Sequence, residues 1–200
     1  MIKRYKQTDI DKLSDILKKD GVISVPTDTV FGVCARINSE KAHNKLVAVK
    51  NRPKEKAFPV MCADIEQIKS VAIVDETVEK LIKAFMPGPL TVILKKSKEL
   101  PDYITNGKNT IAVRMATSEV LIEIIEKVGS PLFMTSANRS GEPTCNNLDE
   151  IEIACPLLDG MLEGEVLFSK GSTIVDCSSN EIKILRAGPI SLEKILDVLK

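Results

Sequence analysis

The sequence has little histidine and few aromatic residues. It contains one histidine, His43, and no tryptophan, and only 4% of its residues are aromatic. A single histidine excludes catalysis by paired histidines and a metal centre with several histidine ligands. The few aromatic rings leave few platforms on which the bases of single-stranded RNA can stack.

The cysteines form no recognisable framework. Five are present, an odd number, and no two stand in a CxxC or CxxH pair: Cys34, Cys62, Cys145, Cys155 and Cys177. This pattern argues against a set of disulfides and against a zinc site. We expect each cysteine to be a small buried apolar residue and not a nucleophile.

Long apolar runs and an excess of either charge are also missing. No run approaches the roughly 20 residues that span a bilayer, and the start, MIKRYKQTD, turns polar early, so we expect a cytoplasmic protein without a membrane segment. Basic and acidic residues number 28 each, so a polyanion must be bound by a local cluster of positive charge. With 200 residues, we expect one domain over residues 1–200.

The apolar spacing alternates between helical and strand patterns. Helices are predicted at 8–20, 39–49, 64–71, 76–85, 118–128 and 148–154 and from residue 191. Thr8 and Asp11 are placed like a capping box for the first, and Gly21 ends it. Strands are predicted at 22–25, 58–62, 90–94, 110–114, 132–135, 165–168, 172–177 and 182–186. Helices and strands alternate, and then strands follow one another, which predicts one α/β domain on a mixed sheet, parallel in part and antiparallel toward the end.

Small polar residues gather at three places. Thr27, Asp28 and Thr29 follow the short strand predicted at 22–25, before a turn at Gly32, where α/β folds favour active sites. Residues 135–141 (TSANRSG) form a polar turn that can donate hydrogen bonds to phosphate, and Ser172 opens a late strand. No GxxxxGK[ST] or GxGxxG motif is present, which excludes a P-loop and a dinucleotide fingerprint.

Arginine is scarce. The chain has six arginines among its 28 basic residues, and four of them lie at a strand end or in a turn: Arg52, Arg114, Arg139 and Arg186. The planar guanidinium grips phosphate or carboxylate with two bonds at a time, so these four are candidate anion ligands. On spacing alone they can equally be unrelated surface residues.

Five motifs in one order resemble a known family. They are residues 26–32 (PTDTVFG), 50–53 (KNRP), 136–141 (SANRSG), 172–176 (STIVD) and 186–188 (RAG). Over most of its length the chain therefore resembles the YrdC family of threonylcarbamoyl-AMP synthases, which make the activated intermediate for the t6A modification of tRNA. Phe31 stands where tyrosine is usual, and residues 115–117 (MAT) stand where proline and then histidine are common. Relatives with a second domain exist, and this chain looks like the single-domain form.

The resemblance implies a fold and a reaction. The fold is a twisted mixed parallel/antiparallel sheet flanked by helices, of the YrdC/RibB-like type. The activity is that of a nucleotidyltransferase, in which L-threonine, bicarbonate or carbon dioxide, and ATP give threonylcarbamoyl-AMP and pyrophosphate. A carbamate oxygen attacks the α-phosphate, so no protein nucleophile is needed.

Site residues follow from the matched motifs. The resemblance implies that Lys50 and Arg52 are catalytic and, with Arg186, bind the ATP phosphates. Ser136 and Asn138 fix the nucleotide, and Arg114 contacts nucleotide or carboxylate. The residues expected to recognise threonine are small and polar: Thr27, Thr29, Thr117 and Ser172. Asp28 is open between capping and a contact with magnesium or the amine. Mg²⁺ is expected with ATP, held by phosphates and water and not by a dedicated protein site.

The partners also follow from the resemblance. We expect the product to pass to the tRNA threonylcarbamoyl transferase complex, with at most weak RNA contact by this chain. The alternative is a non-catalytic RNA-binding module of the same superfamily, centred on Lys50, Arg52, Lys54 and Lys56. Zero net charge and scarce aromatic residues argue against it.

Overall fold

A computed structural model describes residues 1–53, 55–166, 171–179 and 181–200. Its strands are β1 (Arg4–Tyr5), β2 (Ile23–Val25), β3 (Gly32–Arg36), β4 (Val60–Cys62), β5 (Leu90–Lys95), β6 (Thr110–Met115), β7 (Leu132–Ser136), β8 (Gly160–Leu162), β9 (Thr173–Asp176) and β10 (Lys183–Arg186). Its α-helices are α1 (Ile10–Lys18), α2 (Glu40–Lys50), α3 (Ile65–Val71), α4 (Glu76–Phe85), α5 (Asp102–Thr105), α6 (Glu119–Val128), α7 (Leu148–Ala154) and α8 (Leu192–Leu199), and a 3₁₀ turn, Gln7–Asp9, precedes α1. None of the helices in these ranges is long and apolar enough to cross a membrane.

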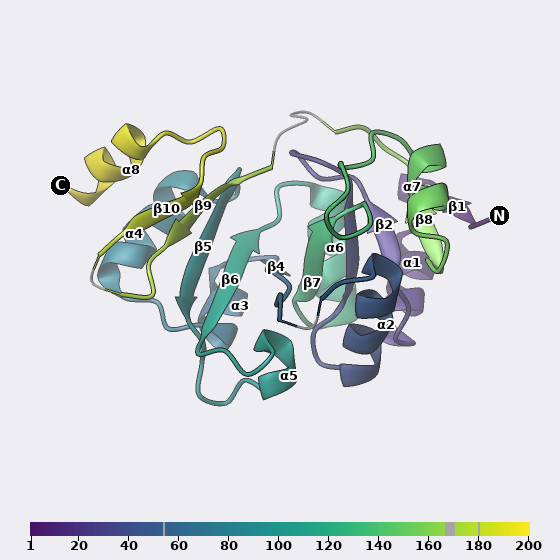
Figure 1. The fold of residues 1–200 in the computed structure, drawn as a ribbon, viewed down its shortest axis with the longest axis horizontal. Helices are drawn as coiled ribbons and strands as arrows, with labels where there is room; N and C mark the ends of the chain where they lie inside the picture. Colours follow the sequence, from purple (N-terminus) through teal and green to yellow (C-terminus); the bar gives the residue numbers. More distant parts are fainter. Residues whose placement is uncertain (54, 167–170, 180) are drawn as a thin grey trace.

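All the described strands join one mixed sheet. Their order is β1-β8-β2-β3-β7-β4-β6-β5-β9-β10. The pairs β1–β8, β2–β8, β4–β6 and β5–β9 are parallel, and the other neighbours are antiparallel. The sheet runs along the long axis of the molecule, with the N-terminus near one end and the C-terminus near the other (Figure 1). The predicted mixed α/β fold is confirmed.

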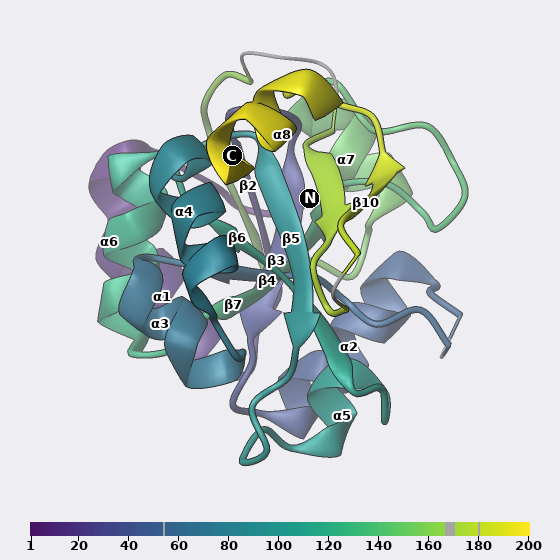
Figure 2. The same ribbon diagram turned by 90° about the vertical axis from the view of Figure 1, so that its left-hand side faces the viewer.

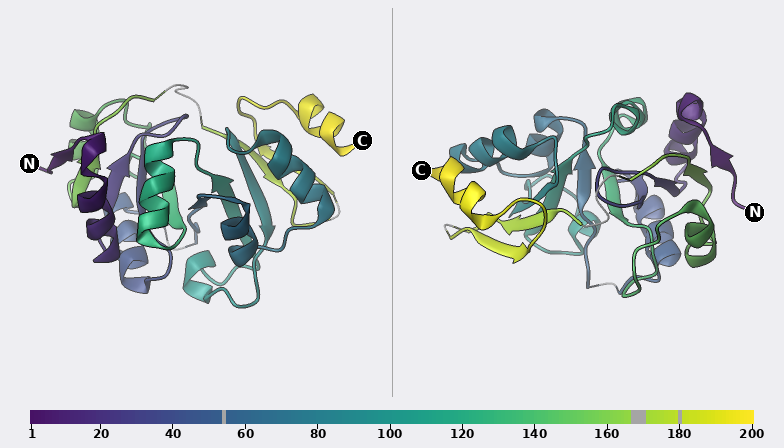
Figure 3. Two further views of the ribbon diagram at one scale, coloured as in Figure 1. Left: turned by 180° about the vertical axis from the view of Figure 1, so that it is seen from behind. Right: turned by 90° about the horizontal axis from the view of Figure 1, so that it is seen from above.

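Helices cover the two faces of the sheet unequally. Helices α1, α3, α4 and α6 lie together on one face, and α2 and α7 lie on the other (Figure 2). The views from behind and from above show the same division (Figure 3). The apolar sides of α1 and α6 meet through Leu13, Leu17, Leu121 and Ile124, all nearly inaccessible to solvent. A second cluster of buried side chains includes Leu46 of α2, Leu81 of α4 and the packed rings of Phe58 and Phe133.

The ends of the helices follow local chemistry. Ser39, Asp64, Asp75, Ser118, Asn147 and Ser191 each accept a hydrogen bond from a backbone N–H of the first helical turn. The expected capping box of Thr8 and Asp11 is wrong, because Asp9 is the N-cap residue of α1 and its carboxylate accepts from the Lys6 N–H. At the other end, Asp20 takes the left-handed conformation, with φ of 64°.

Short strands account for the main differences from the predicted elements. β1, β3 and β8 were not expected, and Gly32 begins β3 instead of forming a turn. Residues 167 and 168 of the strand expected at 165–168 lie outside the described residues, and Glu165 and Val166 are not in a strand. Between β5 and β6, where the sequence predicts neither a helix nor a strand, lies the short helix α5.

Pairing brings distant motifs together across the sheet. Gly32 at the start of β3 is opposite Ser136 at the end of β7, which places the turn after β2 beside the 136–141 loop. Arg114 of β6 is opposite Met61 of β4, and Leu90 of β5 is opposite Thr173 of β9. The polar segments therefore meet on one face of the sheet.

Candidate functional site

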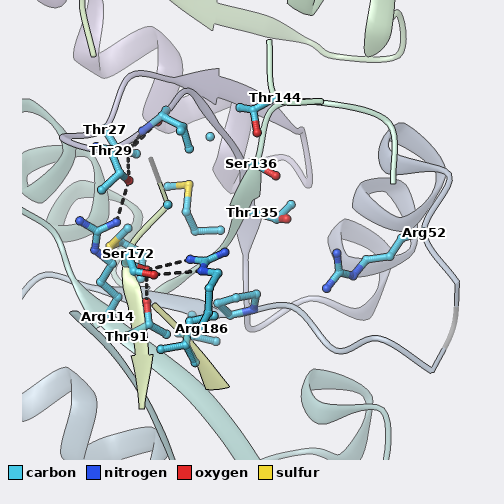
Figure 4. A pocket seen from close by; sticks show the side chains of 18 residues that line it. Thr27, Thr29, Arg52, Thr91, Arg114, Thr135, Ser136, Thr144, Ser172 and Arg186 are labelled. Carbon is cyan, nitrogen blue, oxygen red and sulfur yellow. Dashed lines mark hydrogen bonds between the residues drawn. The ribbon is translucent and has the colours of Figure 1, made fainter. Parts of the chain in front are cut away.

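A pocket of about 400 Å³ lies where these segments meet. Its apolar wall includes Val30, Pro59, Val60, Met61, Met134 and Ile174. Its polar lining consists of hydroxyl and guanidinium side chains from segments far apart in the sequence (Figure 4): Thr27, Thr29, Arg52, Thr91, Arg114, Thr135, Ser136, Thr144, Ser172 and Arg186. The described lining has three arginines and no carboxylate, which suits an anionic ligand.

The turn after β2 is held by its own hydroxyls. Thr27 Oγ1 donates to the carbonyl oxygen of Val30 at 2.6 Å and accepts from the N–H groups of Thr29 and Val30, each at 3.2 Å. The Thr27 and Thr29 hydroxyl oxygens are 3.1 Å apart, and both residues are buried. Thr27 therefore shapes the turn, and Thr29 is held against the pocket by it.

Arg114 forms a buried ion pair with Asp28. Its Nη2 donates to the two carboxylate oxygens of Asp28 at 2.5 and 2.6 Å. Its Nε donates to the Gly88 carbonyl at 3.0 Å, and its Nη1 donates to Thr29 Oγ1 at 3.0 Å. These bonds occupy four of the five N–H groups of a guanidinium, so one remains for a ligand. Asp28 therefore neutralises Arg114, a role that was not among those expected for it.

Arg186 reaches the pocket from β10 and binds Ser172. Its Nε donates to the Ser172 carbonyl at 3.0 Å, and its Nη2 donates to Ser172 Oγ at 3.2 Å. Ser172 Oγ lies 2.7 Å from Thr91 Oγ1 of β5. In the described part of the chain Arg186 forms no ion pair, so its charge is available to a ligand.

Arg52 lies across the pocket from Arg114 and Arg186 (Figure 4). Its Nε and Nη2 donate to the carbonyl oxygens of Lys56 and Ala57 at 2.7 and 2.9 Å, and its guanidinium lies 4.7 Å from the centre of the Phe58 ring. Burial lowers the pKa of Arg52, which nevertheless stays charged. Among the described residues Arg52 has no ion-pair partner, so it supplies a second uncompensated charge.

Lys50 is placed beneath the 136–141 loop and not on the pocket wall. It is 1% exposed, and its Nζ donates to the Ser136 carbonyl at 2.6 Å, to Asn138 Oδ1 at 2.6 Å and to the Asn138 carbonyl. The three hydrogens of the ammonium are thus occupied. This arrangement differs from the expectation that Lys50 binds phosphate directly.

Asn138 is likewise a support of the loop. Its side-chain oxygen accepts from Lys50 and from Ser136 Oγ, the latter at 2.7 Å, and its Nδ2 donates to the Glu142 carbonyl at 2.6 Å. Of the two residues expected to fix the nucleotide, Ser136 lines the pocket and Asn138 holds Ser136 in place.

Thr117, like Lys50 and Asn138, is an expected site residue that lies outside the described pocket lining. It follows β6 and immediately precedes Ser118, the N-cap residue of α6. Two polar lining residues were not expected, Thr91 and Thr144, and Thr135 was expected only as part of the 135–141 turn. Thr91 had a signal in the sequence, because it is a lone polar residue in the buried strand LTVIL.

The remaining reactive side chains lie apart from the described pocket lining. His43 is buried among the rings of Phe58, Tyr103 and Phe133, and burial lowers its pKa. Four cysteines are buried as expected, and Cys177 is partly buried. Burial raises the pKa of the Cys34 and Cys62 thiols and raises that of Cys177 to about 12. Within the described ranges no group of three or more His, Cys, Asp or Glu side chains could hold a metal ion.

Sequence comparison gives one family. The family model of Sua5/YciO/YrdC, described as telomere recombination, matches residues 15–188. A threonylcarbamoyl-AMP synthase of Pyrococcus abyssi is 32% identical over 203 residues, which cover 98% of this chain and 58% of that protein. A threonylcarbamoyl-AMP synthase of Yersinia enterocolitica is 33% identical over 165 residues, which cover 77% of this chain and 86% of the relative. The chain thus spans less than two thirds of the first relative and most of the second.

Solved structures give the same result. The crystal structure of Pyrococcus abyssi Sua5 complexed with L-threonine superposes with a TM-score of 0.92 and 30% identity, covering all of this chain and 61% of that one. The crystal structure of Escherichia coli YciO superposes with a TM-score of 0.88 and 25% identity, covering 98% of this chain and all of the other.

Proposed function

The chain belongs to the Sua5/YciO/YrdC family, and on this premise we propose that it is a threonylcarbamoyl-AMP synthase acting in the cytoplasm. It takes L-threonine, bicarbonate or carbon dioxide, and ATP, and it releases threonylcarbamoyl-AMP and pyrophosphate. The product is handed to the transferase complex that completes t6A on tRNA. The names of two relatives and the complex of Pyrococcus abyssi Sua5 with L-threonine support this assignment.

The observation that carries the proposal is the division of charge in the pocket. Arg52 and Arg186 have uncompensated charges among the described ion pairs, whereas Arg114 is neutralised by Asp28. We assign Arg52 and Arg186 to the phosphates of ATP, because the charged guanidinium group of each retains free N–H groups. The neutral side, with Thr29 and the last N–H of Arg114, is assigned to L-threonine.

The reaction needs position and charge more than it needs a protein nucleophile. The threonine amine and bicarbonate give a carbamate and water. A carbamate oxygen then forms a bond to the α-phosphorus, the bond from that phosphorus to the bridging oxygen breaks, and pyrophosphate leaves with its electron pair. Arg52 and Arg186 stabilise the charge that develops on the phosphate oxygens. Lys50 and Asn138 act as positioning residues that keep Ser136 directed into the pocket.

Magnesium fits the site as a partner of ATP. Asp28 is committed to Arg114, and the described residues offer no carboxylate cluster. Phosphate oxygens and water are therefore the ligands we assign to Mg²⁺, which supplies charge neutralisation when it is bound.

The RNA-binding alternative is not favoured by the geometry. Of its proposed core, Lys50 is buried under a loop, Arg52 lines the pocket, and Lys54 lies outside the described residues. Lys56 is exposed. The three members of this set that the structure describes do not form the continuous basic surface that tracks a nucleic acid backbone.

The test is pyrophosphate release with L-threonine, bicarbonate and ATP omitted one at a time. We expect release only with all three present. Arg52→Ala and Arg186→Ala should each lower release at limiting ATP by about 10-fold to 100-fold, since each removes charge-assisted hydrogen bonds worth roughly 1.5–3 kcal/mol. The matched control is Arg139→Ala, because Arg139 is exposed and donates to the Ala154 carbonyl. Release that does not depend on threonine would refute the assignment.

A further inference from the structure

Thr91 is a buried hydroxyl that the assigned chemistry does not use. It stands in β5 between Leu90 and Val92, which are both fully buried, and it is itself 4% exposed. Its Oγ1 lies 2.7 Å from Ser172 Oγ, and both residues line the pocket. β5 and β9 pair in parallel with Leu90 opposite Thr173, and this pairing brings Ser172, the residue before β9, beside β5.

The two hydroxyls share one hydrogen bond and hold two hydrogens. Ser172 Oγ already accepts from Arg186 Nη2 at 3.2 Å. If Thr91 donates to Ser172, both lone pairs of Ser172 are used and the Ser172 hydrogen is left over. If Ser172 donates to Thr91, the Thr91 hydrogen is left over. In both cases the pair has one free hydrogen beside the cavity.

The ligand that such a pair favours is an oxygen that only accepts hydrogen bonds. A carboxylate oxygen is of this kind. A ligand hydroxyl gains less when Thr91 donates to Ser172, because Ser172 then has no lone pair left to receive the hydrogen of that ligand. In that arrangement the pair favours a carboxylate over a hydroxyl.

We propose that Thr91 is a positioning residue for substrate recognition: through its bond to Ser172 it directs a hydroxyl hydrogen at the carboxylate of the amino-acid substrate. The inference rests on the proposed function, since it takes L-threonine as the ligand. It adds a residue of β5 to the substrate site. It also explains why a polar side chain occupies an apolar strand.

Three variants test the role of Thr91. Thr91→Val keeps the shape and removes the hydroxyl, and Thr91→Ser keeps the hydroxyl. Thr105→Val is the matched control, because Thr105 is a buried threonine whose Oγ1 donates to the Lys108 carbonyl outside the described pocket lining. We expect Thr91→Val to raise the KM for L-threonine about tenfold with the KM for ATP within twofold of wild type. Thr91→Ser should restore the wild-type KM, and Thr105→Val should leave both constants unchanged.

A binding measurement isolates the carboxylate. Calorimetry with L-threonine and with L-threoninol, which lacks the carboxylate, is carried out on wild type and Thr91→Val. Relative to wild type, the variant should bind L-threonine about tenfold more weakly and should bind L-threoninol with unchanged affinity. Equal losses for both ligands, or an unchanged KM for L-threonine in an active Thr91→Val enzyme, would overturn the role of Thr91. Wild-type protein that neither binds L-threonine nor releases pyrophosphate would refute the proposed function itself and remove the substrate on which the role of Thr91 depends.

Discussion

Asp28→Asn tests the buried ion pair most directly. The substitution keeps the shape of the side chain and removes its charge, so the guanidinium of Arg114 is left without a counter-ion. The two side chains are 10% and 8% exposed, and water can therefore do little to compensate. Breaking a buried pair in this way costs about 3–5 kcal/mol.

The expected loss is a large part of the stability of a domain, which is typically about 5–15 kcal/mol. In a chain of this size it lowers the melting temperature by roughly 6 to 20 °C. Urea unfolding and thermal melting at pH 7 measure it. The double variant Asp28→Asn with Arg114→Met should recover stability relative to the single variant, because no unpaired charge remains.

The matched control is Asp11→Asn. Asp11 pairs with Lys127 at 2.8 Å, but its side chain is 84% exposed, so we expect no measurable change in melting temperature. If Asp28→Asn has the melting temperature of the wild type, or if the double variant is less stable than the single one, Asp28 does not compensate the charge of Arg114 as argued.

Three further outcomes are expected. Burial lowers the pKa of Lys50 to about 8 from 10.5, so the folded state loses this proton at a lower pH than the unfolded state does. The unfolding free energy of the wild type should therefore rise between pH 8 and 10.5 by up to about 3 kcal/mol relative to that of Lys50→Met. If urea unfolding gives the same difference in free energy between the two proteins at every pH in this range, the prediction is wrong. In Gly171→Ala the new Cβ would lie 2.9 Å from Arg186 Cζ, so the guanidinium must move. Pyrophosphate release at limiting ATP should fall roughly tenfold, with little change in melting temperature. Full activity of this variant would show that Arg186 does not need its present position. Serine should compete with L-threonine about 10 to 200-fold less well, since it lacks one methyl, and valine should compete still less well because it leaves a hydroxyl partner unpaired. Competition kinetics in which valine surpasses serine would show that the pocket reads shape alone.

The sequence predicted which segments form the site better than it predicted what each side chain does. Thr27, Thr29, Arg52, Arg114 and Ser172 all reach the pocket, because each stands at or near a strand end or helix exit that the apolar pattern locates. The direction of a side chain at such a place depends on the backbone of one or two residues. Asn51 takes the left-handed conformation after α2, with φ of 46°, and so separates a buried Lys50 from an Arg52 that lines the pocket.

The missing strands have a similar cause. β1 has two residues and β8 has three, too few for an alternating pattern, and each is stabilised by its partner in the sheet more than by its own sequence. Gly32, whose residue type is typical of a turn, is the first residue of β3. A Cβ at this position would lie 2.5 Å from Met134 Sδ on the neighbouring strand, so close packing requires glycine there. This contact exists only in the folded sheet and cannot be read from the sequence.

The order of segments in the sheet also has a consequence during biosynthesis. Thr29 and Arg52 are translated early, whereas Ser172 and Arg186 reach the pocket only with β9 and β10, after a delay on the order of ten seconds at ordinary rates of translation. Until β9 pairs with β5, β5 is an unpaired edge strand next to an incomplete pocket. A ribosome that stalls before β9 therefore leaves a nascent chain that lacks two substrate contacts and exposes an edge strand prone to aggregation. Chaperones, and not ligands, must protect such a chain.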